Sequence, residues 1–290
     1  MKNIKNSFLM TLITGSVISL NSCKEITQVE EVYRYEVVEK PAGNENSGSA
    51  EGSIRVMSYD INYTNRAIKG TNTGVLDIEA VADVIKSNKA DIVCMRQVDQ
   101  FTNRGQMDVD QAKKLGELTG MNHFYAPVRE VSQGKSGNAI LSRYPILSSE
   151  NMKLYTDPND EARGAAIAVV DVGKGKKLKV VSIQLEFSKE NNRLTQIDEL
   201  KDKLKQDDTP LVLAGNMTAN VGSASFNKLN EYFMLYTQET PLPTFSYPNP
   251  TTVSDYIFFS SASQLRVINY YTAGYTPNRH VPLIVNFEIK

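Results

Sequence analysis

Eight apolar runs of strand length recur between residues 54 and 289, and they constrain the fold more than any other feature of the sequence. Between them lie three stretches whose apolar residues fall at helical spacing, at 78–85, 112–119 and 194–204. The early runs alternate with these stretches, whereas the late runs cluster. This order predicts an α/β layered domain with a substantial β core. The expected strands are 54–61, 91–98, 138–142, 165–172, 178–185, 210–214, 255–260 and 283–289.

The first 22 residues have the pattern of a targeting segment. Lys2 and Lys5 form a short positive region. An uncharged, largely apolar stretch follows at 7–20, and it is too short for a comfortable membrane span. The chain then reads Leu20-Asn21-Ser22-Cys23, which resembles a bacterial lipoprotein cleavage box. An ordinary secretory signal followed by a chance cysteine is the alternative interpretation.

This resemblance implies three segments. Residues 1–22 are a lipoprotein signal peptide, and 23–52 comprise the lipidated Cys23 and a flexible tether rich in Gly, Asn, Ser and Glu. Residues 53–290 form the folded domain, because no second linker divides them. The resemblance also implies a location in the bacterial cell envelope, held to the membrane through the lipid. Lys24 is not the aspartate associated with inner-membrane retention, so we expect the outer membrane.

The charge balance argues against a general nucleic-acid binder. The chain has 32 Lys and Arg residues against 33 Asp and Glu, a formal net charge of -1. Loss of residues 1–22 removes two lysines and no acidic residue, which leaves 30 against 33, or -3. Without a basic field to attract a phosphate backbone, we expect no general nucleic-acid binding.

Polar residues follow several of the expected strands at the point where each strand ends. Asp60 and Asn62 follow the first strand, and Gln97, Gln184 and Asn216 follow later ones. Side chains at such strand ends gather in one cleft in layered α/β folds. Taken singly, each is better explained as the first residue of a loop.

Seven segments that contain these residues occur in an order typical of one family. They read Met-Ser-Tyr-Asp-Ile-Asn at 57–62, Met-Arg-Gln-Val-Asp at 95–99, Gly-Asn-Ala-Ile-Leu-Ser-Arg-Tyr-Pro-Ile at 137–146, Val-Ser-Ile-Gln-Leu at 181–185, Leu-Ala-Gly-Asn-Met-Thr at 213–218, Ser-Asp-Tyr-Ile-Phe at 254–258 and Arg-His-Val-Pro-Leu at 279–283. Together they resemble the endonuclease/exonuclease/phosphatase family with the DNase-like fold, over essentially all of 54–290. The resemblance implies a four-layer sandwich of the α/β (α+β) class, with two packed mixed β-sheets flanked by helices. It also implies a catalytic cleft at one edge of the sandwich.

Three residues match positions that the family uses at its active site. The resemblance implies that Asp255 orients and polarises a catalytic histidine, His280. Asn138 matches as well, either for the cleft or for folding alone. The Asp255–His280 pair is equally consistent with a hydrogen bond kept for structure.

Six other family positions are altered, and three of the changes oppose a bound cation. The family usually has asparagine at Asp60, a magnesium-binding glutamate at Gln97, histidine at Gln184, aspartate and asparagine at Asn216 and Thr218, and aspartate at Arg279. Gln97 and Asn216 are neutral amides, and Arg279 is a permanent cation. Because magnesium normally requires carboxylate ligands, we expect no metal at the family's affinity and no resident cofactor.

Two functions from different classes remain. In the first, which we favour, the domain is a catalytically impaired binding or scaffold module, because the losses fall at the charged positions that a metal requires. In the second, it is a metal-dependent phosphodiesterase or phosphatase with a rebuilt site, in which Asp60, Asp255 and His280 hold magnesium or manganese. Asp99 is a further acidic candidate for that site, although such a residue is more often a structural loop acid.

For a binding module we expect a small anionic ligand, a glycan or a surface protein partner. Arg279, with Arg163, Lys135 or Arg96, suits a phosphate, sulfate or carboxylate group. Taken singly, each of these basic residues is better explained as solvated surface. We also expect Arg279 to pair with Asp60 if the two face each other across the cleft, since the new cation and the new anion would neutralise each other.

Overall fold

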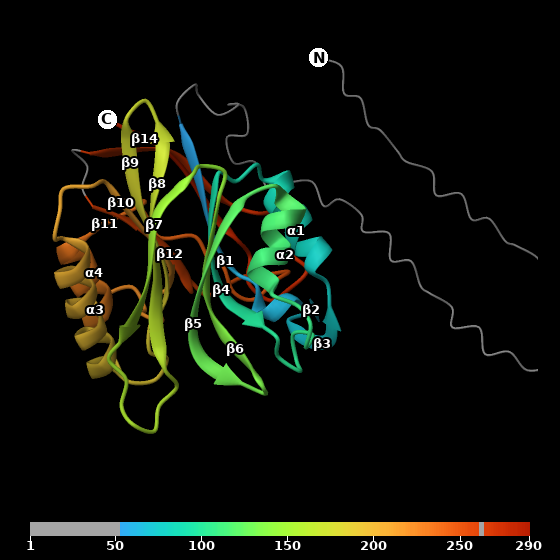
Figure 1. Cartoon of the computed structure of the whole chain (residues 1–290). Helices are drawn as coiled ribbons and strands as arrows, with labels where there is room; N and C mark the ends of the chain where they lie inside the picture. Colours follow the sequence, from blue (N-terminus) through green and yellow to red (C-terminus); the bar gives the residue numbers. More distant parts are fainter. Residues whose placement is uncertain (1–52, 261–263) are drawn as a thin grey trace, which may run out of the picture. The chain divides into compact units, whose positions relative to one another are not determined.

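Two six-stranded β-sheets lie face to face at the centre of the structure (Figure 1). The computed structural model describes residues 53–260 and 264–290. The signal peptide expected at 1–22, the lipidated Cys23 and the tether at 23–52 lie outside the described residues.

The first sheet has the strand order β13-β14-β1-β4-β6-β5. Its strands are β1 (Ile54–Asp60), β4 (Ile92–Gln100), β5 (Asn122–Val131), β6 (Gly134–Ser142), β13 (Leu265–Thr272) and β14 (Leu283–Ile289). Only β1 and β4 run parallel; the other neighbours are antiparallel. A hairpin of β2 (Asn65–Ile68) and β3 (Thr71–Leu76) follows β1. The sheet is therefore mixed, and β1 and β4 end at the same edge.

The second sheet has the order β11-β12-β10-β9-β8-β7. Its strands are β7 (Ile146–Leu154), β8 (Arg163–Gly173), β9 (Lys176–Gln184), β10 (Leu211–Asn216), β11 (Met234–Leu235) and β12 (Asp255–Phe259). Here β9 and β10 form the parallel pair, so this sheet is mixed as well.

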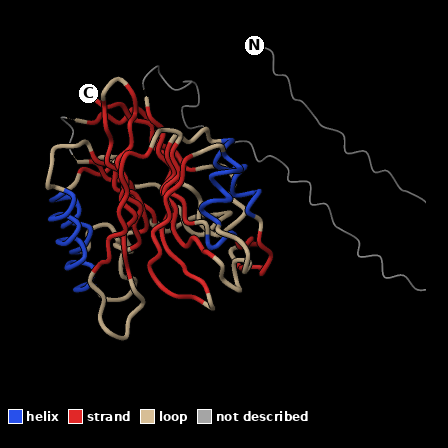
Figure 2. Tube along the Cα trace, in the orientation of Figure 1, coloured by secondary structure: helices blue, strands red, loops and turns tan. Residues whose placement is uncertain are grey.

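Two pairs of helices cover the outer faces of the sheets (Figure 2). The helices α1 (Ile78–Ser87) and α2 (Gln111–Thr119) pack their apolar residues against the first sheet. The helices α3 (Glu190–Leu204) and α4 (Ala224–Tyr232) pack against the second. The result is the four-layer sandwich that the sequence predicts. Within the described part of the chain, no helix is long and apolar enough to cross a membrane.

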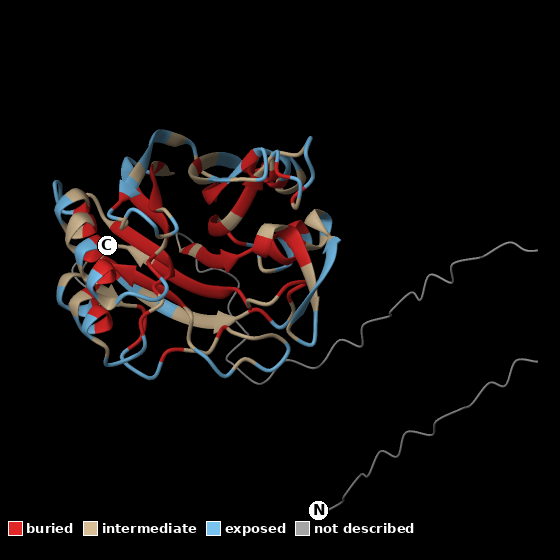
Figure 3. Cartoon of the chain, turned by 90° about the horizontal axis from the view of Figure 1, so that it is seen from below, coloured by how far each residue is buried: buried red, intermediate tan, exposed pale blue. Residues whose placement is uncertain are grey.

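The space between the sheets is filled by apolar side chains from both. Val56 and Ile140 come from the first sheet and Val180 and Phe259 from the second, and all four are fully buried. Full burial of a side chain of this size contributes about 1.5–3 kcal/mol. Buried residues follow the strands and the inner helix faces, whereas exposed residues gather in the loops (Figure 3). The loops of the cleft are thus carried by a rigid core.

The eight expected strands and the three expected helices are all present, with bounds that differ by a few residues. The α/β sandwich prediction is confirmed. The apolar pattern missed four strands, β5, β7, β11 and β13, as well as the β2–β3 hairpin and α4.

Candidate functional site

Strand register places three of the expected site residues in one row across the second sheet. Asn216, the last residue of β10, lies opposite Gln184 of β9 on one side and Asp255 of β12 on the other. In the first sheet Asp60, the last residue of β1, lies opposite Arg96 of β4. The two rows meet because Arg96 reaches from the first sheet to Asp255 in the second. These strand ends form the floor of the candidate site.

Asp60, Arg96, Asp255 and His280 make up a group that we call the buried cluster. Arg96 is fully buried, and its Nη2 is paired with Oδ1 of Asp255 while its Nη1 donates to Ser58 Oγ at 3.0 Å. His280 Nδ1 lies 3.1 Å from the other oxygen, Oδ2, of Asp255. His280 Nε2 faces Asp60, whose Oδ2 is 3.9 Å away. The two carboxylates are at most 1% exposed and the imidazole is 12% exposed, so the cluster is nearly dry.

The charges of the buried cluster shift the pKa values of two of its members. Burial raises the pKa of Asp255, but Arg96 and His280 lower it by more, so the pKa of this carboxyl lies below its ordinary value. Burial lowers the pKa of His280, but Asp60 and Asp255 raise it by more, so the pKa of this imidazole lies above its ordinary value. The arrangement stabilises an imidazolium between two carboxylates.

Gln97 stands where the family pattern has a metal-binding glutamate, and its amide bonds to Asp60. β4 bulges between Met95 and Val98, and Gln97 has a φ of +51° in the left-handed region. Its Nε2 donates to Asp60 Oδ2 at 3.1 Å, while Asp60 Oδ1 accepts from the backbone N–H of Asn62 at 3.0 Å. Compared with the family pattern, the amide and the carboxylate have exchanged places.

The chain leaves β1 through a left-handed turn. Asn62, Tyr63 and Thr64 have φ values of +46°, +44° and +62°. This region costs a non-glycine residue about 1–2 kcal/mol. The surroundings hold the turn: Asn62 Nδ2 donates to Asn72 Oδ1 at 2.8 Å, and Gln111 Nε2 donates to the Tyr63 carbonyl at 2.9 Å. Backbone strain of this kind collects at functional sites, and here it sets the position of Asn62 beside the buried cluster.

Asn216 and Thr218, the altered Gly-Asp-x-Asn positions, are engaged in holding the loop after β10. Asn216 Oδ1 accepts from the backbone N–H of Thr218 at 2.9 Å, and its Nδ2 donates to Ser254 Oγ at 2.9 Å. The Thr218 hydroxyl donates to the Glu186 carbonyl at 2.5 Å. Both polar atoms of the Asn216 amide are therefore committed to local structure.

Arg279 does not pair with Asp60, contrary to the expectation. Its guanidinium lies over the ring of Phe245, 4.8 Å from the ring centroid, and it makes no ion pair among the described residues. The same ring packs against His280, with centroids 4.8 Å apart. Asp60 meets Gln97 and His280 instead, because the bulge in β4 turns the Gln97 amide toward it.

Three other charged candidates pair with side chains of the protein itself, and for Asp99 this agrees with the interpretation of a structural loop acid. Arg96 is sealed in the buried cluster, and Lys135 Nζ lies 3.9 Å from Glu130 near the turn between β5 and β6. Asp99, the acidic candidate for a rebuilt metal site, is fully buried and accepts from Arg104 at 2.7 and 2.9 Å. Asp99 is therefore a structural acid.

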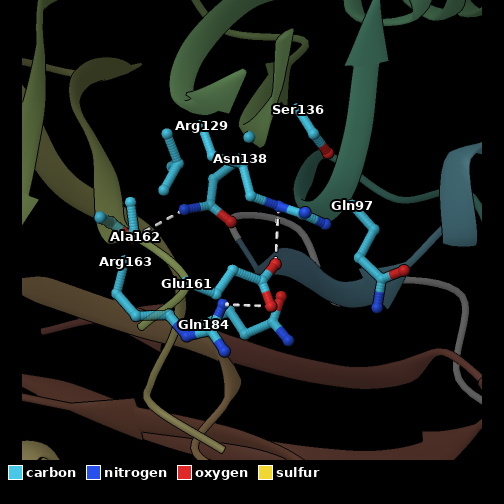
Figure 4. Close-up of a pocket in the computed structure, with 11 residues that line it drawn as sticks. Gln97, Arg129, Ser136, Asn138, Glu161, Ala162, Arg163 and Gln184 are labelled. Carbon is cyan, nitrogen blue, oxygen red and sulfur yellow. Dashed lines mark hydrogen bonds and ion pairs between the residues drawn. The ribbon is translucent and has the colours of Figure 1, made fainter. Parts of the chain in front are cut away.

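A second group of polar side chains lines a pocket of about 160 Å³ beside the buried cluster (Figure 4). We call it the arginine pocket, and the polar side chains around it are Gln97, Arg129, Ser136, Asn138, Glu161, Arg163 and Gln184. Asn138 Nδ2 donates to the Gly164 carbonyl at 2.7 Å, which joins the two sheets at the pocket wall. Sequence reasoning gave no signal for Arg129, which lies on the missed strand β5, or for Glu161, which lies in the loop before β8.

The carboxylates of the buried cluster have their oxygens engaged. Asp255 is held by Arg96 and His280, and Asp60 by Asn62 and Gln97. Within residues 53–260 and 264–290, no three His, Cys, Asp or Glu side chains are grouped so as to hold a metal ion.

The sequence matches one described family over more than half of its length. This family is "PGAP2IP, C-terminal nuclease-like domain", and the match spans residues 69–239 of the 290. The uncharacterized protein YbhP of Escherichia coli (strain K12) is 25% identical over 142 residues, which are 46% of this chain. The match covers 56% of YbhP, so the chain spans little more than half the length of this relative.

Solved structures with the same fold come from bacteria and from human. An endonuclease/exonuclease/phosphatase from Beutenbergia cavernae superposes with a TM-score of 0.67 at 17% identity, over 82% of this chain and 72% of that one. The mannosyl-6-phosphatase Bt3783 of Bacteroides thetaiotaomicron gives 0.64 at 16% identity, over 81% and 99%. The human Nocturnin catalytic domain with bound sulfate gives 0.63 at 17% identity, over 83% and 94%. At these identities the likeness shows the fold.

Proposed function

The chain belongs to the endonuclease/exonuclease/phosphatase family, and from that premise we propose that it is a lipid-anchored binding module whose cleft holds an anionic ligand without hydrolysing it. The observation that carries the proposal is the buried ion pair between Arg96 and Asp255. The guanidinium is a permanent cation held on one oxygen of the only family carboxylate that the cleft retains. An internal cation at this position opposes the arrival of a metal cation.

The donor set of the cleft does not fit magnesium. A magnesium ion requires carboxylate oxygens that face it, and it sheds its water reluctantly. To reach Asp255 it would displace Arg96 or His280, and to reach Asp60 it would displace the Gln97 amide or a backbone N–H. The proposal therefore includes no resident metal and no metal-dependent step.

The remaining groups do not activate a nucleophile. The family pattern assigns that role to an aspartate where Asn216 stands, and an amide cannot accept a proton there. Its two polar atoms are also committed to Thr218 and Ser254. Phosphoryl transfer needs both a positioned nucleophile and charge stabilisation of the transferring group, so the acid–base pair by itself does not support the reaction.

One observation favours a second candidate, a phosphoester hydrolase with a rebuilt site. His280 lies between Asp60 and Asp255, and these carboxylates raise its pKa, so the imidazole keeps a proton for a leaving group to higher pH than an ordinary histidine does. One structural neighbour is a mannosyl-6-phosphatase, which makes a phosphomonoester the first substrate class to examine.

Hydrolysis assays distinguish the two candidates. The full-length chain in detergent is offered phosphodiesters, phosphomonoesters including mannose 6-phosphate, DNA and RNA, with magnesium, manganese or chelator. We expect no turnover above the His280→Ala variant under any condition. Turnover that is lost in His280→Ala would reject the binding-module proposal in favour of the hydrolase.

A gain-of-function series tests whether the buried ion pair blocks the chemistry. One variant combines Gln97→Glu, Gln184→His, Asn216→Asp, Thr218→Asn and Arg279→Asp, and a second adds Arg96→Gln. We expect magnesium binding by calorimetry only in the second, because the first still has the guanidinium on Asp255. Equal magnesium affinity in the two variants would show that Arg96 does not oppose the metal.

The proposal places the module in the bacterial cell envelope, with the outer membrane as the expected location. The domain begins at the amino end of β1, whereas Asp60 and the cleft lie at its carboxyl end. The ligand that we propose for the cleft is a small anionic molecule, a glycan or a surface protein. We expect labelled palmitate to be incorporated in a bacterial host and to be lost in Cys23→Ser; equal labelling of both forms would reject lipidation at Cys23.

A further inference from the structure

The arginine pocket contains two guanidinium groups, and the neutral polar side chains around them do not balance their positive charge. The Arg163 side chain, at the start of β8, is only 7% exposed. Its Nε is buried and has no hydrogen-bond partner among the described residues. The nearest carboxylate oxygen to that atom, on Glu186, is 3.6 Å away, which is too far for a hydrogen bond. The guanidinium of Arg163 is therefore buried with hydrogen-bonding capacity that the surrounding side chains do not meet.

Glu161 supplies an acceptor from the chain itself. Its Oε1 lies 2.6 Å from Arg129 Nε, and its Oε2 lies 3.3 Å from Arg163 Nη1, so the carboxylate bridges two guanidinium groups (Figure 4). The side chain of Glu161 is nevertheless 43% exposed and belongs to the loop between β7 and β8. The two arginines, by contrast, lie on strands. The anion is thus the least fixed member of the group.

We infer that the arginine pocket is a binding site for a phosphate or sulfate group, and that Glu161 occupies the place of this ligand until it is displaced. The inference rests on the anion-binding part of the proposed function. Two arginines that each pair with one oxygen of a carboxylate are also spaced to pair with two oxygens of a tetrahedral anion, and arginine is a common partner of phosphate. A pocket of about 160 Å³ has room for several water molecules and hence for one such group.

The surroundings allow the exchange. Glu186, the other carboxylate near Arg163, has its Oε1 bound by the Ser188 N–H and hydroxyl, each at 2.9 Å, so it stays outside the pocket. Asn138 and Gln184 add neutral polar groups to the wall (Figure 4). A ligand that carries more negative charge than a carboxylate interacts more strongly with the two arginines than Glu161 does. Because Glu161 lies in an exposed loop, its side chain can move into solvent when the ligand displaces it.

Calorimetric titration of the full-length chain in detergent with inorganic phosphate, and separately with sulfate, tests the inference at one fixed ionic strength. We expect Glu161→Gln to bind at least one of the two anions about three- to tenfold more tightly than the unaltered chain, which corresponds to loss of the two partly exposed ion pairs of Glu161. The matched control is Glu130→Gln, which removes the same charge from the neighbouring strand β5 outside the pocket. We expect it to bind as the unaltered chain does.

Variants of the two arginines complete the test. We expect Arg129→Met and Arg163→Met each to weaken binding at least tenfold; Arg129 is 34% exposed, so its variant keeps the test valid if Arg163→Met fails to fold. Equal affinity in Glu161→Gln and Glu130→Gln, or unchanged affinity in Arg129→Met, would overturn the inference. Binding is read without turnover, so a positive hydrolysis assay rejects the proposed function alone, and a failed titration rejects the pocket alone.

Discussion

The buried cluster and the arginine pocket both pair guanidinium groups with carboxylates, in opposite settings. In the buried cluster Arg96 and Asp255 are at most 1% exposed, and the partners belong to strands of two different sheets. In the arginine pocket the carboxylate of Glu161 is 43% exposed and belongs to a loop. A charge left unpaired in the first setting is not reached by water, whereas in the second the Glu161 carboxylate is solvated. The first pairing is therefore a structural lock, and the second is an exchangeable site.

The largest expected effect comes from removing the Arg96 guanidinium from the structural lock in the buried cluster. We expect Arg96→Met to lower the free energy of unfolding by about 3–5 kcal/mol, because it leaves Asp255 buried without its main cation. The measurement is the midpoint of urea unfolding at unchanged slope. The double variant Arg96→Met with Asp255→Asn is expected to recover part of the loss, since neither charge then remains unpaired. A loss below about 1 kcal/mol for Arg96→Met would show that water screens the pair, and the two settings would not differ.

The sequence could predict which residues gather at the cleft, but not what Arg96 does there. Strand ends follow from the apolar runs, so the sequence alone predicts that Asp60, Gln97 and Asn216 lie at one edge. Two features of the packing cannot be predicted from the apolar runs. The bulge in β4 turns Gln97 toward Asp60, and the long side chain of Arg96 crosses between the sheets. Neither has a signal in local spacing, so the sequence indicates Arg96 only as solvated surface or as an anion ligand.

A similar distinction holds for the fold, because the apolar pattern predicts the central strands of each sheet but not the edge strands. All six residues of β10, a central strand, are buried, and no polar side chain occurs in it before Asn216, its last residue. In β7, at the edge of the same sheet, only the last residue is buried, and the strand contains Ser148, Ser149, Glu150 and Asn151. The four missed strands in the two large sheets are their four edges. Edge strands form through pairing with a neighbour, and polar side chains there leave no apolar pattern.

A smaller effect is expected when pH changes the charge of His280. Its folded pKa is raised, so its stabilising contribution is fully present below its ordinary pKa of 6.5 and is lost as pH rises through the folded value. We therefore expect the stability difference between the unaltered chain and His280→Asn to be largest below pH 6.5 and to shrink in more alkaline buffer. Urea unfolding at a series of pH values checks this; a difference independent of pH would mean that His280 does not titrate between the carboxylates.

The protonation of His280 can be followed directly, because the chain has only two histidines. In an NMR titration, with His123→Gln to assign the signals, we expect His280 to titrate above 6.5. We expect Asp60→Asn to move its midpoint down, since Asp60 is the largest of the causes that raise it. An unmoved midpoint would place Asp60 outside the electrostatics of the buried cluster.

The smallest expected effect is that of removing the Glu161 carboxylate from the arginine pocket. We expect Glu161→Gln to change the free energy of unfolding by no more than about 1 kcal/mol, because solvent screens a carboxylate that is 43% exposed and both arginines lie on strands that other contacts hold. Urea unfolding of Glu161→Gln and Arg96→Met under the same conditions compares the two changes in the free energy of unfolding. If Glu161→Gln destabilises the chain as strongly as Arg96→Met, its carboxylate is itself a lock, and no ligand of ordinary affinity would displace it from the arginine pocket.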